Sequence, residues 1–258
     1  MKKGMNKQFT TLLLIVITSI LVFWLHRIQR KKTPVLPETI VIGTSADFKP
    51  ISFRQDDQLV GFDIDVVTEV AKRINKPFVI KDMPFDLLIP QLQLGSIQIV
   101  AAGITATPER TKRAIFTTPY INSNPLFVLT KADTTPLKSI EDLKGKTVIV
   151  NQGYTADLYM SLVTDINLVR LPSLSDALLA LMSGRGDALV TAGNTLNPLF
   201  EHYPKEKFNL FMIPETNDTV SLAISSHYPE LARQVQHVLQ TMEQDGTLIT
   251  LKEKWKLT

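Results

Sequence analysis

A short apolar run that stops at a glycine, followed by a helix-start signal, most constrains how this chain can fold. The run Ile97–Ala102 has the length and apolar character of a buried strand, with a single polar break. Gly103 then lets the backbone approach another group closely. Thr107 and Pro108 are typical of a helix N-cap and of the first helical position. The stretch therefore predicts a strand that ends at a pocket and leads into a helix beginning at Pro108.

Arg110 lies in the first turn of that expected helix, where the helix dipole disfavours a cation. A guanidinium in this place indicates a nearby anion, because an Arg fork, exposed backbone N–H groups and a Thr hydroxyl together suit one carboxylate. The alternative is an Arg that only pairs with an acidic side chain on the surface. The local sequence by itself favours neither interpretation.

Residues 1–32 are predicted to be a targeting segment and not part of the fold. Lys2, Lys3 and Lys7 precede the uncharged run Phe9–Leu25, and a second basic cluster follows it. A cleaved signal peptide and an uncleaved N-terminal membrane anchor are both compatible with this pattern. We expect an exported, periplasmic protein, and tethering to the membrane by this segment stays open.

The charge of the chain is unevenly distributed. Lys and Arg number 28 and Asp and Glu 25, but seven of the cations and none of the acids lie before residue 33. The remainder has 21 cations and 25 acids, a net charge of about −4, which argues against a nucleic-acid surface. The absence of cysteine excludes disulfides, thiol nucleophiles and cysteine metal sites. The four histidines are scattered, so neither a metal site nor a catalytic triad is indicated.

Strand and helix patterns alternate after residue 38, which predicts two α/β units with open parallel sheets. We expect a linker at 33–38, a first lobe formed by 39–124 and 218–258, and a second lobe formed by 125–217. Two chain crossings between the lobes would make a hinge. Open α/β sheets bind ligands at the carboxyl ends of their strands, so a cleft is expected between the lobes.

Four loops that follow strands are expected to face this cleft. They are residues 43–48, 103–110, 151–155 and 191–194. Ser175 is expected to cap a helix over 176–182.

Beyond these patterns, the chain resembles the bacterial extracytoplasmic solute-binding proteins of family 3, the polar amino-acid-binding proteins of ABC importers. The matching stretches keep their order from about residue 39 to 257, and together they are highly specific. They are Ile42-Gly43-Thr44, Leu59-Val60-Gly61-Phe62-Asp63-Ile64-Asp65, Phe85-Asp86-Leu87-Leu88-Ile89-Pro90-Gln91-Leu92, Thr105-Ala106-Thr107-Pro108-Glu109-Arg110, Phe116-Thr117-Thr118-Pro119-Tyr120, Leu143-Lys144-Gly145-Lys146-Thr147-Val148, Gly184-Arg185-Gly186-Asp187-Ala188 and Gln244-Asp245-Gly246-Thr247. The resemblance is strongest to the arginine- and lysine/arginine/ornithine-binding members. It implies a type II periplasmic-binding-protein-like fold.

The resemblance also implies roles for residues at matching positions. Arg110 would hold the α-carboxylate of an amino acid, and Thr155 of the second lobe would donate to it when the lobes close. Gly103 and Thr105 would contact the α-amino and carboxylate groups.

The side chain of the ligand would lie between Phe48 and Phe85, where a flat guanidinium is well suited to stacking and cation–π attraction. Asp47, Ser45 and Gln152 complete the expected ligand-binding set.

This chain departs from the family pattern in two places. Ala192 stands where many relatives have an Asp that binds the α-ammonium, and Ser45 stands where relatives that bind cations often have an acid. The α-ammonium would then rely on the Gly103 carbonyl group, on Thr105 or on a group not identified from the sequence. Asp47 or Asp63 is the expected substitute for the negative charge missing at Ser45.

The leading hypothesis is a non-enzymatic receptor, monomeric and without a cofactor or metal, that binds L-arginine by lobe closure and delivers it to an ABC permease. Lysine, ornithine, histidine and glutamine stay open as ligands. One alternative is a cyclohexadienyl dehydratase-like enzyme on the same fold, which needs a carboxylic acid with a raised pKa in the cleft. Another is the sensing ectodomain of an anchored protein.

Overall fold

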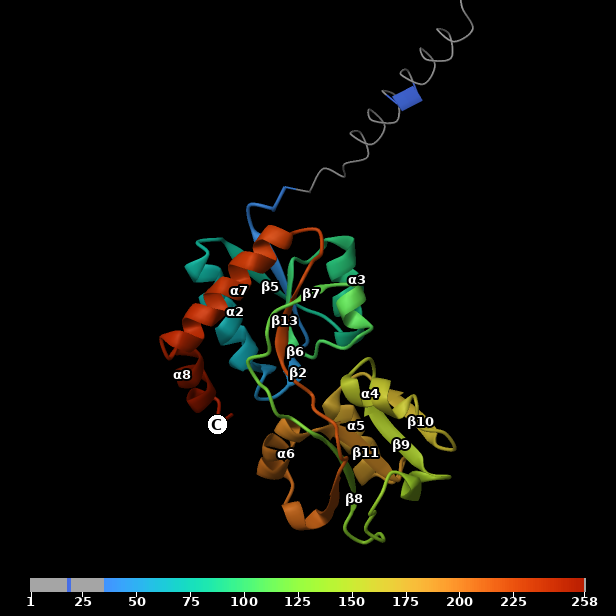
Figure 1. Ribbon diagram of the computed structural model, residues 1–258. Coiled ribbons are helices and arrows are strands. Elements are labelled where there is room, and N and C mark those ends of the chain that lie inside the picture. The colour runs from blue at the N-terminus through green and yellow to red at the C-terminus, as the bar shows by residue number, and fades with distance from the viewer. Residues whose placement is uncertain (1–17, 20–34, 258) are drawn as a thin grey trace, which may run out of the picture. The chain divides into compact units, whose positions relative to one another are not determined.

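The computed structural model describes residues 18–19 and 35–257 (Figure 1). The chain divides into two units, residues 1–35 and 36–258, and all contacts discussed below lie within the second. Apart from Thr18 and Ser19, the predicted targeting segment lies outside the described residues. Within the described part of the chain, no helix combines the length and the apolar character that crossing a bilayer requires.

The first of two five-stranded sheets has the strand order β5-β1-β6-β13-β7. These strands are β1 (Ile40–Thr44), β5 (Phe78–Asp82), β6 (Ile99–Ile104), β7 (Ile115–Phe116) and β13 (Ser221–Ile224). Strand β1 pairs in parallel with β5 and β6, whereas β13 is antiparallel to both β6 and β7.

Strand β6 is buried on both faces, and its side chains alternate between two cores. Ile99 and Ala101 pack with α2 (Phe62–Arg73), α7 (Pro229–Gln244) and α8 (Thr247–Lys254), whereas Val100, Ala102 and Ile104 pack with α3 (Phe85–Leu94). Figure 1 shows α2 and α7 on one side of the sheet and α3 on the other. A continuous apolar run of this kind is what a strand covered on both faces requires.

The second sheet has the order β10-β9-β11-β8-β12. Its strands are β8 (Leu126–Lys131), β9 (Thr147–Asn151), β10 (Asn167–Leu171), β11 (Ala188–Ala192) and β12 (Phe208–Met212). Helix α4 (Thr155–Met160) packs on one face, and α5 (Leu174–Met182) and α6 (Leu196–His202) pack on the other. Here β8 is the antiparallel strand, and it pairs with both β11 and β12.

The remaining elements are short. Strands β2 (Asp47–Phe48), β3 (Ser52–Gln55) and β4 (Gln58–Val60) form a small antiparallel sheet. The hairpin turn between β3 and β4 lies at Asp56 and Asp57, with φ of 48° and 60°. Within residues 35–257 there are also four 3₁₀ turns: η1 (Arg110–Lys112), η2 (Glu141–Leu143), η3 (Gly193–Thr195) and η4 (Lys205–Lys207).

The α/β class is confirmed, but the expectation of parallel sheets is wrong. Each large sheet is mixed, because β8 and β13 are the strands that follow a crossing from the other sheet. The crossing segments 117–125 and 213–220 run antiparallel beside each other and are joined by a bridge between Ile121 and Val220. A strand that follows such a crossing enters its sheet from the end opposite to that used by a βαβ connection.

Three local expectations also need correction. The helix expected from Pro108 is only the turn η1, because β7 begins at Ile115 and leaves no room for more. The sequence from Gln152 also predicts a helix that runs to about Leu162, but α4 covers only Thr155–Met160. The cap of α5 is Ser173 and not Ser175, since the Ser173 hydroxyl oxygen accepts a hydrogen bond from the Asp176 N–H at 3.0 Å.

We expect Ser173→Ala to lower the free energy of unfolding by about 1 kcal/mol, the usual effect of losing an N-cap hydroxyl. Ser175→Ala is the matched control, because Ser175 lies inside the first turn, where alanine is at least as favourable. Urea denaturation of both variants checks the assignment. Equal stability of the two would contradict it.

Candidate functional site

Three of the four loops expected to face the cleft meet one another. Arg110, after β6, donates through Nη2 to the carbonyl oxygen of Gly153, after β9, at 2.7 Å. The Tyr154 hydroxyl donates to Asp47 Oδ1, after β1, at 3.0 Å. The carboxyl ends of strands from both sheets therefore converge on one cluster of side chains.

Arg110 is the centre of this cluster and is 6 % exposed. Besides its bond to Gly153, it donates through Nη1 to the carbonyl oxygen of Thr105 at 3.0 Å, and its guanidinium lies 5.3 Å from the centroid of the Phe85 ring. Burial lowers the pKa of Arg110, and the nearby Asp218 carboxylate opposes that effect. A guanidinium stays protonated in proteins, so this is a buried cation suited to an anionic partner.

Asp218 supplies a buried carboxylate that the sequence patterns did not predict. It lies in the second crossing segment, beside the Thr105 hydroxyl and within hydrogen-bonding reach of the Thr155 hydroxyl. Burial raises its pKa, and the two hydroxyls and Arg110 oppose the increase. No strand or helix pattern covers this stretch. The only signal that could have found it is the presence of acids in the segment that returns to the first sheet, and Glu215 shares that signal.

Thr105 and Thr155 thus approach Asp218 from opposite sheets. Thr105 is buried, and its hydroxyl also lies 2.8 Å from the carbonyl oxygen of Thr219. Thr155 is the first residue of α4. The structure therefore brings these two predicted residues together with Arg110.

Gly103 has a structural reason to be glycine. Its φ is +67°, and a Cβ at this position would lie 2.5 Å from the Phe48 ring. Its N–H donates to Asp63 Oδ2 at 2.7 Å, so a buried side chain holds the main chain of this loop in place. Phe48 is packed directly over this glycine.

The aromatic pair Phe48 and Phe85 is present, and the ring of Tyr154 contacts both members. It stacks on Phe85 with a centroid distance of 4.1 Å and meets Phe48 edge-on at 5.9 Å. Ser45 donates to the same Asp47 oxygen that accepts the Tyr154 hydroxyl, at 2.9 Å. Sequence reasoning missed Tyr154, although a large aromatic residue between Gly153 and Thr155 was a usable signal.

Gln152 does not join this cluster. Its amide Nε2 donates to Asp86 Oδ2 at 2.8 Å, and both side chains are exposed at the edge of the contact between the loops. This bond crosses from the segment after β9 to helix α3.

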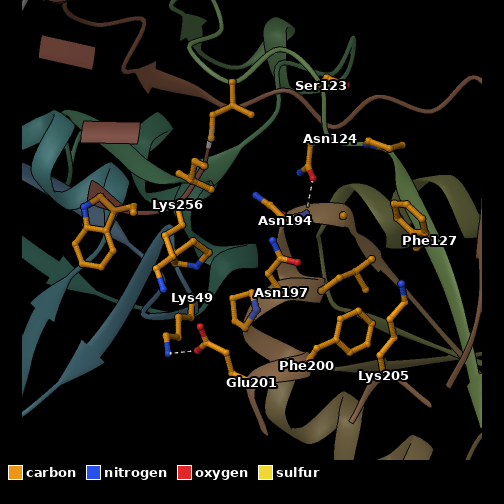
Figure 2. A pocket seen from close by; sticks show the side chains of 18 of the residues that line it. Lys49, Ser123, Asn124, Phe127, Asn194, Asn197, Phe200, Glu201, Lys205 and Lys256 are labelled. Atoms are coloured by element: carbon orange, nitrogen blue, oxygen red, sulfur yellow. Dashed lines mark hydrogen bonds and ion pairs between the residues drawn. The ribbon is translucent and has the colours of Figure 1, made fainter. Parts of the chain in front are cut away.

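The fourth loop, after β11, lies elsewhere. The Asn194 N–H donates to Asn124 Oδ1 of the first crossing segment at 2.7 Å. Both residues line a separate hollow of about 780 Å³ (Figure 2), which also includes an ion pair between Lys49 and Glu201 at 3.1 Å. Ala192, at the end of β11, is buried and places no charged group in the cluster around Arg110.

Asp63 supports the cluster from the interior. It is fully buried and accepts hydrogen bonds from the Gly103 N–H and, at 2.8 Å, from the Tyr120 hydroxyl. Burial raises its pKa from 3.8 to about 7, and the two hydrogen bonds only partly oppose this. Asp63 therefore holds a loop in place and does not face the cluster. Within the described part of the chain, no group of three potential metal-ligating side chains occurs.

Comparison with known proteins now identifies the family. Residues 40–258 match the model of the bacterial extracellular solute-binding proteins, family 3. The chain belongs to this family. The sequence resemblance and the type II binding-protein fold are thereby confirmed.

Family members similar to the chain are amino-acid-binding proteins. The arginine-binding extracellular protein ArtP of Bacillus subtilis is 32 % identical over 228 residues, which cover 84 % of this chain and 85 % of that protein. An ancestral arginine-binding protein solved with arginine has a TM-score of 0.78 and 33 % identity, over 85 % of this chain and 98 % of that one. An ancestral arginine-binding protein has also been solved with glutamine.

A third relative bears on the enzyme alternative. The ancestral amino-acid-binding protein AncCDT-1, a precursor of cyclohexadienyl dehydratase, has a TM-score of 0.74 and 34 % identity, over 84 % of this chain and 95 % of that one. The curated relatives are solute-binding proteins and not enzymes.

The raised pKa of Asp63 predicts how stability depends on pH. The folded protein binds this proton more tightly than the unfolded chain, so the associated stability is fully present below about pH 4 and is lost as pH rises to about 7. Asp63→Asn keeps an oxygen for the Gly103 N–H and a donor for Tyr120, without a charge. The free energy of unfolding of the wild type should therefore fall relative to that of the variant between pH 5 and pH 8, by an amount on the order of a few kcal/mol.

Urea denaturation of both proteins at the two pH values measures the effect. Asp57→Asn, at the tip of the exposed hairpin, is the control, since asparagine tolerates its positive φ. Parallel pH profiles for the wild type and Asp63→Asn would show that Asp63 is charged throughout this range.

Proposed function

We propose that this protein is the extracytoplasmic, periplasmic receptor of an amino-acid ABC importer, that its ligand is L-arginine, and that the ligand binds in the cluster around Arg110. The observation that carries the proposal is a buried guanidinium placed beside a buried carboxylate, with the ring of Phe85 against the guanidinium. An α-amino acid presents the complementary charges at the same short spacing.

Each part of the ligand has a partner in this arrangement. The α-carboxylate binds the guanidinium of Arg110 and the hydroxyl of Thr155, and the α-ammonium binds Asp218 and Thr105. Asp218 thus takes the role that an Asp at the position of Ala192 plays in many relatives. The side chain extends between Phe48 and Phe85.

The carboxylate of Asp47, next to the aromatic pair, favours arginine over amino acids with shorter or neutral side chains. Asp47 provides a carboxylate there, next to Ser45, and a planar guanidinium can stack on a ring while it donates to a carboxylate. Arginine-binding relatives at about one-third identity support the same ligand. Because an ancestral arginine-binding protein has also been solved with glutamine, the other polar amino acids should be tested as ligands as well.

Binding by closure follows from the origin of the site residues. Arg110 and Thr105 follow β6 of the first sheet, and Phe85 begins α3, which packs on that sheet. Thr155 begins α4, which packs on the second sheet. A ligand that contacts both sides stabilises the closed arrangement by its differential affinity, and a permease can recognise that arrangement. No cofactor or metal takes part in this mechanism, and a monomer suffices for it. We further propose that residues 1–32 direct export, with or without retention as an anchor.

Arg110→Ala should abolish most arginine binding, with a loss of about 2–5 kcal/mol, because a buried ligand carboxylate would be left without its partner. Isothermal titration calorimetry measures the loss. Arg113→Ala is the matched control, because Arg113 lies one turn away and binds Gln93 and Glu109 on the surface. Unchanged arginine affinity in Arg110→Ala, with a normal melting curve, would refute the site.

A second function has one observation in its favour. Asp218 is a cleft carboxyl whose pKa is raised by burial, which is what a general acid in a dehydratase requires. If the chain were a cyclohexadienyl dehydratase, incubation with prephenate or arogenate would form phenylpyruvate or phenylalanine, and Asp218→Asn would stop it. We expect no product from the wild type at enzyme concentrations that give full arginine binding.

A further inference from the structure

The slot assigned to the side chain of the ligand is occupied by part of the protein itself. Tyr154 enters from the loop after β9, and its ring lies against Phe85 and Phe48. Its hydroxyl donates to Asp47 Oδ1 at 3.0 Å. A ring of the second lobe therefore makes both the stacking contact and the polar contact expected of a bound guanidinium.

Gly153, the residue before Tyr154, occupies the place expected for the ligand carboxylate. The carbonyl oxygen of Gly153 accepts a hydrogen bond from Arg110 Nη2 at 2.7 Å, where a ligand carboxylate oxygen would accept one. The dipeptide Gly153-Tyr154 thus makes three contacts that an amino acid with a long, flat, donor-bearing side chain would make in the same site.

The main chain that presents Tyr154 is held firmly. Gly153 has a φ of +76°, and its N–H donates to Asp157 Oδ2 at 2.9 Å. Asp157 is itself buried and accepts from Arg170 Nε at 2.8 Å. A Cβ on Gly153 would lie 3.1 Å from the Cβ of Asp86, so glycine is needed for this close approach. Rotation about the Cα–Cβ bond of Tyr154 clears the side-chain slot, whereas freeing Arg110 Nη2 for a ligand carboxylate requires the Gly153 carbonyl group to move away with its lobe.

We propose that Tyr154 is an internal competitor for the ligand side chain, and that it sets both the affinity and the selectivity of the receptor. This inference rests on the proposed function. A ligand reaches the slot only by displacing the ring, so it must replace the stacking on Phe85 and the hydrogen bond to Asp47. A guanidinium replaces both, whereas an ammonium replaces only the polar contact. The same ring holds the two lobes together until a ligand displaces it.

Calorimetry with L-arginine on the full chain tests the competition. Tyr154→Ala should bind arginine about tenfold more tightly than the wild type, because the stacking and the hydrogen bond no longer have to be displaced. Tyr154→Phe keeps the ring but not the hydroxyl, and it should fall between the two. Tyr159→Phe is the matched control, since Tyr159 lies in helix α4, which directly follows Tyr154, and packs in the core of the second sheet.

A second measurement does not depend on the ligand. The chain has no cysteine, so spin labels can be placed uniquely at Leu94→Cys, near the end of α3, and Leu162→Cys, after α4, both on exposed side chains. Without arginine, the distance between the labels should lengthen or broaden in Tyr154→Ala and stay near the wild-type value in Tyr154→Phe. Circular dichroism shows whether each variant folds.

The outcomes separate the two proposals. If the wild type binds arginine and Tyr154→Ala binds it no more tightly, Tyr154 is not a competitor and the inference is wrong. If no variant binds any amino acid, the proposed function is wrong, and the label distances alone decide whether Tyr154 holds the lobes together. Identical label distances in the wild type and Tyr154→Ala would contradict the proposal that Tyr154 holds the lobes together.

Discussion

A single buried guanidinium organises the site of this protein. Arg110 reaches it from a one-turn helix at the end of the central strand of the first sheet, and it is held by carbonyl oxygens from both sides of the cleft. Isolated buried cations are strongly destabilising, so the surroundings must compensate. Asp218, the carbonyl groups of Thr105 and Gly153, and the face of Phe85 provide that compensation. Each of these groups directs negative charge or an electron-rich face toward the guanidinium.

A second ionisable group, the carboxyl group of Asp63, is buried near this cation, and it differs in having a raised pKa. Asp63 connects the Gly103 loop to Tyr120 of the first crossing segment, and its carboxyl group has a pKa near neutrality. The loop that shapes the cleft and the segment about which the lobes would move are therefore linked through one titratable side chain. A substitution at Asp63 would affect the geometry of the site without removing any contact to a ligand.

Much of this could be predicted from the sequence where local signals are strong. Helices α3 and α7 carry strong local signals, because Gly95 adopts the left-handed conformation that stops a helix and Pro229 is suited to starting one. Arg110, Thr105 and Phe85 were predictable because motif and local chemistry agree. Asp218 and Tyr154 were not, because their roles arise only when segments more than a hundred residues apart meet. The antiparallel strands β8 and β13 were missed for the same reason, since local periodicity does not report strand direction.

The order of strands in the first sheet has a consequence for how the chain is made. Strand β13 lies between β6 and β7, yet it is contributed by residues 221–224, after the whole second sheet has been synthesised. The second sheet can form from one continuous stretch, whereas the first has an unfilled interior position until nearly the whole chain is available. The exposed edge of β6 in that interval is a ready template for wrong pairing. The last forty residues are therefore the closing piece of the first sheet and its core, and a nascent chain released without them would be a target for quality control.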